Sequence, residues 1–179
     1  MTTTQTIDLI ERVIEWAGWL ARLCVLALVL LVASDVILRY LFSIGPVALQ
    51  ELEWHLISPI ALLGLSYTMK HGGDVRVDFL YERFSWRLRA LVNLFGAILT
   101  VAVSLIITYL SIAYVAQSWQ LGEGSPDPGG LPMRYLLKAF IPLGFTLLAL
   151  QGLAASLRAW LTLRGQLPPD DDHTDEVMS

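Results

Sequence analysis

The sequence predicts an all-α, polytopic membrane protein with four transmembrane helices and both termini in the cytoplasm. Composition is the first observation: 55% of the 179 residues are hydrophobic and only 16% are charged. The second is that the apolar residues gather in four long runs, and the third is that lysine and arginine are unevenly shared among the connections. A soluble core of this size does not need such long uncharged runs.

Each run is long enough to form a span. A membrane-spanning helix needs about 20 mostly apolar residues to cross roughly 30 Å of hydrocarbon. Three runs contain no Asp, Glu, Lys or Arg: residues 23–34, 90–122 and 139–157. The fourth, residues 54–69, has only His55 as an ionisable group. We therefore predict a membrane domain over residues 16–162, with spans near 17–39, 48–70, 89–116 and 136–161.

The first 15 residues begin polar and then become amphipathic. Ile7, Ile10 and Ile14 fall on one helical face, so residues 1–15 are expected to extend the first span and to lie partly in the membrane interface. The acidic residues of this leader are unlike the basic start of a signal peptide, and the following run is long enough to span. We interpret the first span as retained.

The last connection and the carboxy-terminal tail are rich in residues that break helices. Residues 123–132 hold three prolines and three glycines, which predicts a turn-rich external loop. Residues 163–179 form an acidic tail with few apolar residues, which we expect to be disordered. Pro59 and Pro142 lie inside the second and fourth spans, where each removes a backbone donor and is expected to kink its helix.

The distribution of basic residues predicts the orientation. Nine of the 12 lysines and arginines lie near the two termini or in the 71–88 loop, and only Arg39, Arg134 and Lys138 flank the other two connections. Orientation follows this distribution rather than the net charge of −4. Both termini and the 71–88 loop are therefore expected to face the cytoplasm.

Four charged residues lie at the external ends of the first two spans. Asp35 and Arg39 are one helical turn apart and can pair, and Glu51 and Glu53 lie at a similar depth. Ionisable groups within a membrane usually find protein partners, which predicts a polar lock that holds helices or a partner subunit in register. The alternative is that all four reach the headgroup layer and are solvated.

The residues predict no enzyme, no cofactor and no metal. Haem ligation would need two histidines at matching depth on facing helices, but His71 lies at the opposite end of the span from His55. The single thiol, Cys24, lies within the first span and makes no metal site with one histidine. We find no phosphate-binding motif and no catalytic constellation. The uncharged centres of three spans are typical of a scaffold rather than of a transport pathway.

Three motifs resemble the small membrane subunit of tripartite ATP-independent periplasmic (TRAP) transporters, the DctQ-type family. RYLF closes the first span at residues 39–42, and QEL opens the second at residues 50–52. The third motif follows the second span, where the family pattern is glycine-histidine-(Ile/Val)-x-Val-Asp. Here it reads GDVRVD, and the four residues of interest are Gly73, Asp74, Arg76 and Asp78. Because Asp74 replaces the histidine, a role of that histidine is not carried over. The fourth span, from GLPMRYLLK onward, is also similar to one branch of the family.

The resemblance implies a function and partners. A periplasmic solute-binding protein captures a solute, often an organic acid, and a large membrane subunit moves it inward with an ion gradient. The small subunit braces the large one in the inner membrane of a bacterial cell, among membrane lipid, and no nucleic acid is involved. Two other classes stay open: a membrane anchor of a respiratory enzyme, and a small stand-alone exporter with Asp35 as its proton-coupling acid.

Overall fold

The computed structural model describes residues 3–73 and 84–168, which form four long helices and no strand within those ranges. The helices are α1 (Thr3–Phe42), α2 (Val47–Lys70), α4 (Trp86–Gln120) and α5 (Arg134–Leu163). The predicted all-α class with four helices is confirmed. The described part of the chain does not include the acidic end of the tail, residues 169–179, and the division into three segments stays a prediction.

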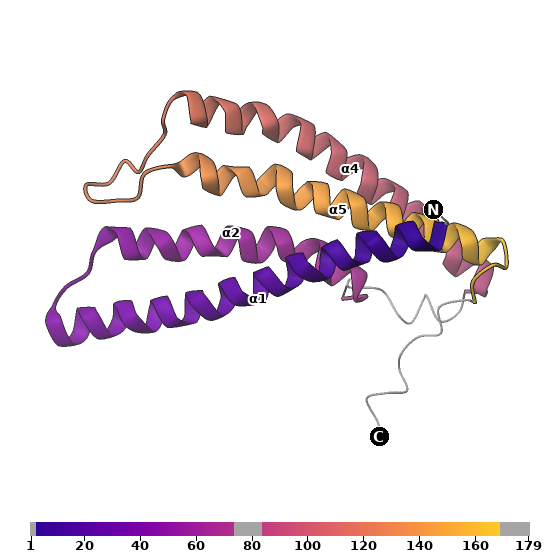
Figure 1. Cartoon of the computed structure of the whole chain (residues 1–179), viewed down its shortest axis with the longest axis horizontal. Helices are drawn as coiled ribbons and strands as arrows, with labels where there is room; N and C mark the ends of the chain where they lie inside the picture. The colour runs from indigo at the N-terminus through magenta and orange to yellow at the C-terminus, as the bar shows by residue number, and fades with distance from the viewer. Residues whose placement is uncertain (1–2, 74–83, 169–179) are drawn as a thin grey trace, which may run out of the picture.

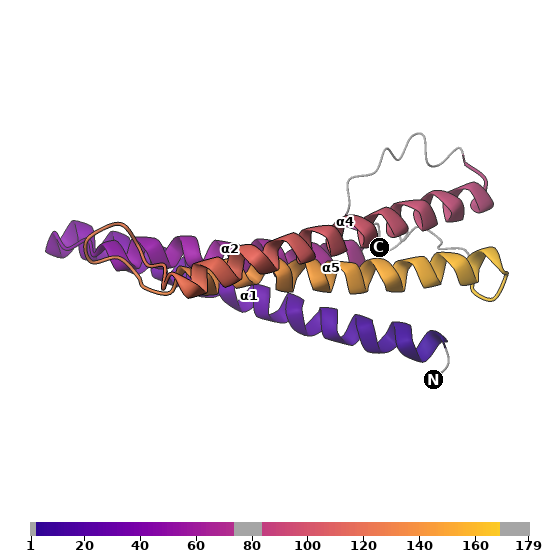
Figure 2. The same cartoon turned by 90° about the horizontal axis from the view of Figure 1, so that it is seen from above.

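The helices form two antiparallel hairpins that lie side by side in one layer, which the start of α1 leaves to lie across α5 (Figures 1 and 2). α1 pairs with α2, α4 pairs with α5, and α2 packs on α5 to join the hairpins, giving the order α4, α5, α2, α1 across the layer (Figure 1). The connections 43–46 and 121–133 lie at one end, which we call the loop end. The opposite end, with the start of α1 and the end of α5, is the terminal end, where α1 also contacts α5 and diverges from α4 (Figure 2).

Local sequence explains where the helices stop. Gly122 adopts φ +56°, and the N–H of Glu123 donates back to the carbonyl of Ser118 at 3.1 Å, which closes α4. Gly72, at φ +65°, ends α2 in the same way, since the N–H of Gly73 donates to Thr68 O at 2.9 Å. Glycine adopts this left-handed conformation without a Cβ clash, so the glycines at these two positions favour the ends of α2 and α4 seen here.

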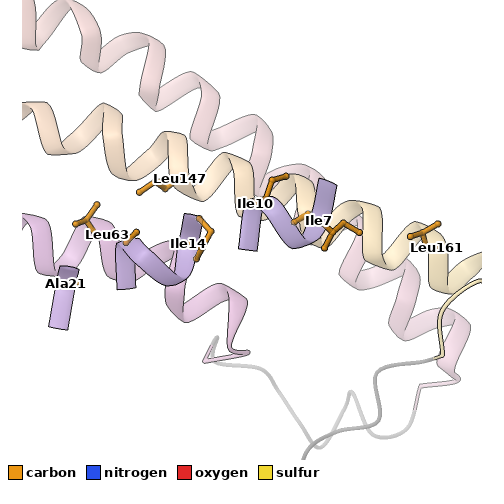
Figure 3. Packing of buried hydrophobic residues seen from close by; sticks show 9 residues of the cluster. Ile7, Ile10, Ile14, Ala21, Leu63, Leu147 and Leu161 are labelled. Atoms are coloured by element: carbon orange, nitrogen blue, oxygen red, sulfur yellow. The ribbon is translucent and has the colours of Figure 1, made fainter. Parts of the chain in front are cut away.

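The main apolar core lies towards the terminal end (Figure 3). Ile7, Ile10 and Ile14 of α1 are buried, and they cluster with Leu63 of α2 and Leu147 of α5. The amphipathic face of the first 15 residues is therefore packed inside the protein. This packing explains why α1 continues as one helix back to Thr3, well before the predicted start of the span.

A stripe of small residues joins α4 to α5. The buried residues of α4 recur every seventh position: Ala90, Ala97, Ser104, Ser111 and Ser118. Opposite them, a Cβ on Gly152 would lie 3.3 Å from the carbonyl oxygen of Ala97. Small residues let helix backbones approach closely in a membrane, where packing rather than the hydrophobic effect holds helices together. A seven-residue period is also the repeat of left-handed helix pairs.

Three of the four described helices, α1, α4 and α5, are long and apolar enough to cross a membrane. α2 has 24 residues, and a helix of that length extends about 36 Å, which also exceeds the hydrocarbon thickness. Its first turns carry the ionisable residues Glu51, Glu53 and His55. Both α2 and α5 continue through their prolines, Pro59 and Pro142, as single helices.

Candidate functional site

Glu51 is the centre of a polar cluster at the loop end. Its carboxylate accepts hydrogen bonds from the Ser125 hydroxyl and, at 2.6 Å, from the backbone N–H of Leu131. Arg134, the first residue of α5, lies 3.6 Å from the same carboxylate. Glu51 thus fastens the start of α2 to the 121–133 loop and to the start of α5.

A second cluster, around Glu123, closes the α4–α5 hairpin. The Glu123 carboxylate accepts hydrogen bonds from the Lys138 ammonium and, at 2.6 Å, from the Ser118 hydroxyl. The hydrogen bond from Lys138, followed by that from Ser118, lowers the pKa of Glu123 from its ordinary value of 4.5. Lys138 also lies 4.1 Å from the centroid of the Tyr114 ring. The sequence pattern did not single out Glu123 or Lys138 as a pair.

The four residues of the predicted polar lock do not gather at one point. Arg39 donates to Asp35 at 2.5 Å, as their spacing predicts. Asp35 is buried, with 4% of its surface exposed, whereas the Arg39 side chain is 53% exposed. Glu51 turns instead to the 121–133 loop. Glu53 is half-buried and makes no hydrogen bond or ion pair within residues 3–73 and 84–168. A role for these residues at a subunit interface stays a prediction.

The loop motif after α2 is described only at its first residue. The N–H of Gly73 closes α2, and a Cβ on Gly73 would lie 2.8 Å from Cγ2 of Thr68, so the position favours glycine. Asp74, Arg76 and Asp78 lie outside the described residues. Their place in the family motif stays a prediction from the sequence.

The terminal end carries ion pairs that the sequence analysis missed. Glu15 of α1 accepts from Lys70 at 2.5 Å and from His71 at 2.8 Å, at the end of α2. Glu11, one turn earlier, accepts from Arg158 of α5 at 2.7 Å. The four-residue spacing of Glu11 and Glu15 was a visible signal, since it places both on one helical face.

Away from the two ends of the bundle, the described residues include few side chains that could bind a metal or carry out catalysis. Residues 3–73 and 84–168 contain no group of three His, Cys, Asp or Glu that could hold a metal ion. The buried polar residues near the middles of the helices are uncharged and include Ser66, Ser104 and Gln151. This arrangement can hold helices together, but it offers no charged relay through the layer.

Long apolar helices with charges grouped at their two ends define a multi-pass membrane protein. Residues 9–162 match the family model described as "Tripartite ATP-independent periplasmic transporters, DctQ component". The chain belongs to this family and is therefore the small membrane subunit of a TRAP transporter, not an enzyme. This assignment excludes the respiratory anchor that the sequence analysis left open.

A curated relative agrees with this assignment. The chain is similar to the ectoine TRAP transporter small permease protein TeaB of Halomonas elongata, at 26% identity over 108 residues. The alignment covers 60% of this chain and 55% of the relative. The chain thus matches little more than half the length of that protein.

Proposed function

We propose that this subunit braces the large membrane subunit of its transporter during gradient-driven uptake of a solute that a periplasmic binding protein delivers. The observation that carries the proposal is the uncharged middle of the helices. The centres of α1, α4 and α5 carry no charge, and the buried polar residues near the middles of α4 and α5, Ser104 and Gln151, are uncharged. Ion-coupled transporters bind ion and solute near the midplane of the membrane, usually with interrupted helices.

The outer helices of the layer offer a wide apolar surface for such a partner. Leu26 and Leu30 of α1, and Ile106 and Leu110 of α4, are each more than half exposed. Exposed apolar side chains suit either lipid or a second membrane subunit, and large patches of this kind often mark contact sites. We place the subunit in the inner membrane of a bacterial cell, with both termini cytoplasmic.

We further propose an organic acid as the solute class. The name of the relative gives ectoine as its solute. Ectoine carries a carboxylate, as organic acids do, so a carboxylate-bearing solute agrees with the family resemblance and with this relative. Because no group of this chain is assigned to the solute, the choice is expected to rest with the other two subunits.

Reconstitution tests the function. The chain alone in proteoliposomes should show no uptake of organic acids or ectoine under a sodium or proton gradient. The large subunit with loaded binding protein should take up solute only when this chain is present. Uptake by this chain alone, lost in Asp35→Asn, would instead establish the stand-alone exporter. Full uptake without this chain would contradict the bracing role.

A further inference from the structure

The loop end holds a pocket that is lined by both polar and apolar side chains. It has a volume of about 640 Å³ and lies between α2, α5 and the 121–133 loop, with Tyr114 of α4 at its edge. This volume is typical of sites for small molecules, which are roughly 300–1,000 Å³. The polar lining residues include His55, Asp127 and Arg134, which we call the polar wall, and the apolar ones include Trp54, Leu137 and Ile141, which we call the apolar wall.

His55 brings an unused acceptor to the polar wall. Its Nδ1 lies 2.7 Å from the carbonyl oxygen of Glu51, which can only accept a hydrogen bond. Nδ1 must therefore carry the hydrogen, and in the neutral ring Nε2 is left with a lone pair. Nε2 is buried beneath the pocket wall and has no hydrogen-bond partner among residues 3–73 and 84–168. Because His55 lines the pocket, Nε2 is the acceptor that we assign to a donor bound there.

Two further groups of the polar wall have unused capacity. The carboxylate of Asp127 makes no hydrogen bond or ion pair with the described part of the chain, although the backbone N–H of this residue donates to Ser125. The guanidinium of Arg134 has five N–H donors and approaches the Glu51 carboxylate only to 3.6 Å. Glu123 and Lys138, also in the wall, are occupied with each other. The pocket thus offers an acceptor region and, beside it, a separate cationic donor.

We propose that this pocket binds the headgroup of a phospholipid that carries a primary ammonium group, such as phosphatidylethanolamine. The ammonium group donates to Asp127 and His55, the phosphate accepts from Arg134, and the acyl chains follow the apolar wall. Charge-assisted hydrogen bonds of this kind are among the strong ones. The subunit would then select its lipid by the N–H groups of the head.

The same features favour a lipid over a protein side chain. A lysine from another subunit would satisfy the acceptors but bring no anion for the remaining donors of Arg134, whereas a zwitterionic headgroup carries both charges. The apolar wall runs along the first turns of α2 and α5, where tryptophan and headgroups meet at a membrane surface. This proposal concerns the pocket of the chain itself and does not depend on the bracing role.

Native mass spectrometry of the full chain tests the proposal. The protein is first equilibrated with vesicles that contain equal amounts of phosphatidylethanolamine and phosphatidylcholine with the same acyl chains, and the lipid that it retains is then measured. The quaternary ammonium of phosphatidylcholine has no N–H to donate, so the wild type should retain phosphatidylethanolamine by about tenfold over it. Asp127→Asn and His55→Phe should each bring that ratio towards one. Arg134→Gln should lower retention of both lipids alike, because both carry the phosphate.

Asp8→Asn is the matched control, since it removes one carboxylate from the exposed face of α1 at the terminal end. It should leave the lipid ratio unchanged, and helicity by circular dichroism confirms that each variant is folded. Equal retention of the two lipids by the wild type would overturn the proposal.

Two further experiments distinguish a bound lipid from a free zwitterion and from a protein partner. Free phosphoethanolamine at millimolar concentration should not displace the lipid, because it lacks the chains that contact the apolar wall. Displacement would show that the site takes a free zwitterion. A photocrosslinker in place of Leu137 should label lipid in the assembled transporter. Labelling of the large subunit would assign the pocket to a protein partner and overturn the lipid proposal.

Discussion

The backbone N–H of Leu131 donates a 2.6 Å hydrogen bond to the Glu51 carboxylate, joining residues that are 80 positions apart. This bond ties the first turns of α2 to a loop with three prolines and three glycines in ten residues. Within the loop, the N–H of Ser125 donates to Leu131 O and the N–H of Gly130 donates to Asp127 O, both at 3.0 Å. The Glu51 carboxylate adds the contact that fixes this loop to the other hairpin.

Glu51→Gln should loosen the 121–133 loop. The amide keeps the size of the side chain but removes the charge that strengthens the bonds from Ser125 and Leu131. We expect a lower melting temperature and faster protease cleavage within the loop. Glu53→Gln, two residues along the same helix, should change neither. An equal loss in both variants would mean that charge at this end, and not the particular contact, stabilises the fold.

Gly144→Ala should destabilise the junction between the hairpins. A Cβ at Gly144 would lie 2.7 Å from the backbone oxygen of Leu62 in α2, so the two helices must move apart. Overpacking of this kind costs about 1–3 kcal/mol. Gly96→Ala is the matched control, because a Cβ there meets nothing within 4 Å and alanine should gain about 0.5–1 kcal/mol in a helix. Thermal unfolding in detergent measures both changes, and equal melting temperatures would contradict the close approach.

Arg39→Ala should destabilise the protein by leaving Asp35 without its partner. Asp35 is buried and one of its oxygens, Oδ1, already lacks a hydrogen bond within the described residues. Leaving a buried acceptor unsatisfied costs about 1–3 kcal/mol. The variant should show reduced yield and a lower melting temperature, and Asp35→Asn in the same background should recover part of the loss. Wild-type behaviour of Arg39→Ala would support the solvated alternative.

Acid should weaken the α4–α5 hairpin through Glu123. Its pKa is lower in the folded chain than the ordinary value of 4.5, because the carboxylate accepts from Lys138 and Ser118. The stabilisation is therefore fully present above that ordinary value and is lost as the pH falls through the lower, folded-state pKa. The difference in melting temperature between the wild type and Glu123→Gln should shrink between pH 7 and pH 3. A difference that is constant with pH would exclude this carboxylate as the source.

Alkaline phosphatase fusions test the orientation. Nine of the 12 basic residues predict that the loop end faces the periplasm. Fusion after Gly45 or Gly129 should therefore give phosphatase activity, and fusion after Arg83 or Asp171 should give none. Activity at Arg83 would reverse the topology.

Hydropathy predicted the four helices well, but it did not predict all of their ends. The span predicted at 48–70 agrees with α2, because apolar sequence and helix coincide there. α1 begins at Thr3, before the span predicted from residue 17, in the segment that the isoleucine pattern predicted as an extension of that span. Packing of Ile7 and Ile10 continues the helix beyond the apolar run. A hydropathy pattern reports the preferred solvent of a segment, whereas a helix continues for as long as its hydrogen bonds and packing allow.

The polar contacts were harder to predict than the helices. The Asp35–Arg39 pair lies within one helix, so its spacing was sufficient. The partner of Glu51 depended on how the 121–133 loop folds back over α2, which no local pattern contains. The small residues of α4 recur every seven positions, which is visible in the sequence. The stripe was missed because the sequence was examined for charged residues and for glycine pairs, and this stripe consists of alanine and serine.

The layer of two hairpins also has a consequence for biogenesis. Most helix packing joins neighbours in the sequence, α1 with α2 and α4 with α5, so each hairpin can form as soon as its second helix enters the bilayer. Contacts between nearby segments form quickly, and distant ones must wait for the chain to close a longer loop. The junction of α2 with α5 is then the late step of assembly. Substitutions such as Gly144→Ala should leave insertion intact and instead produce a subunit whose halves are correctly inserted but not joined.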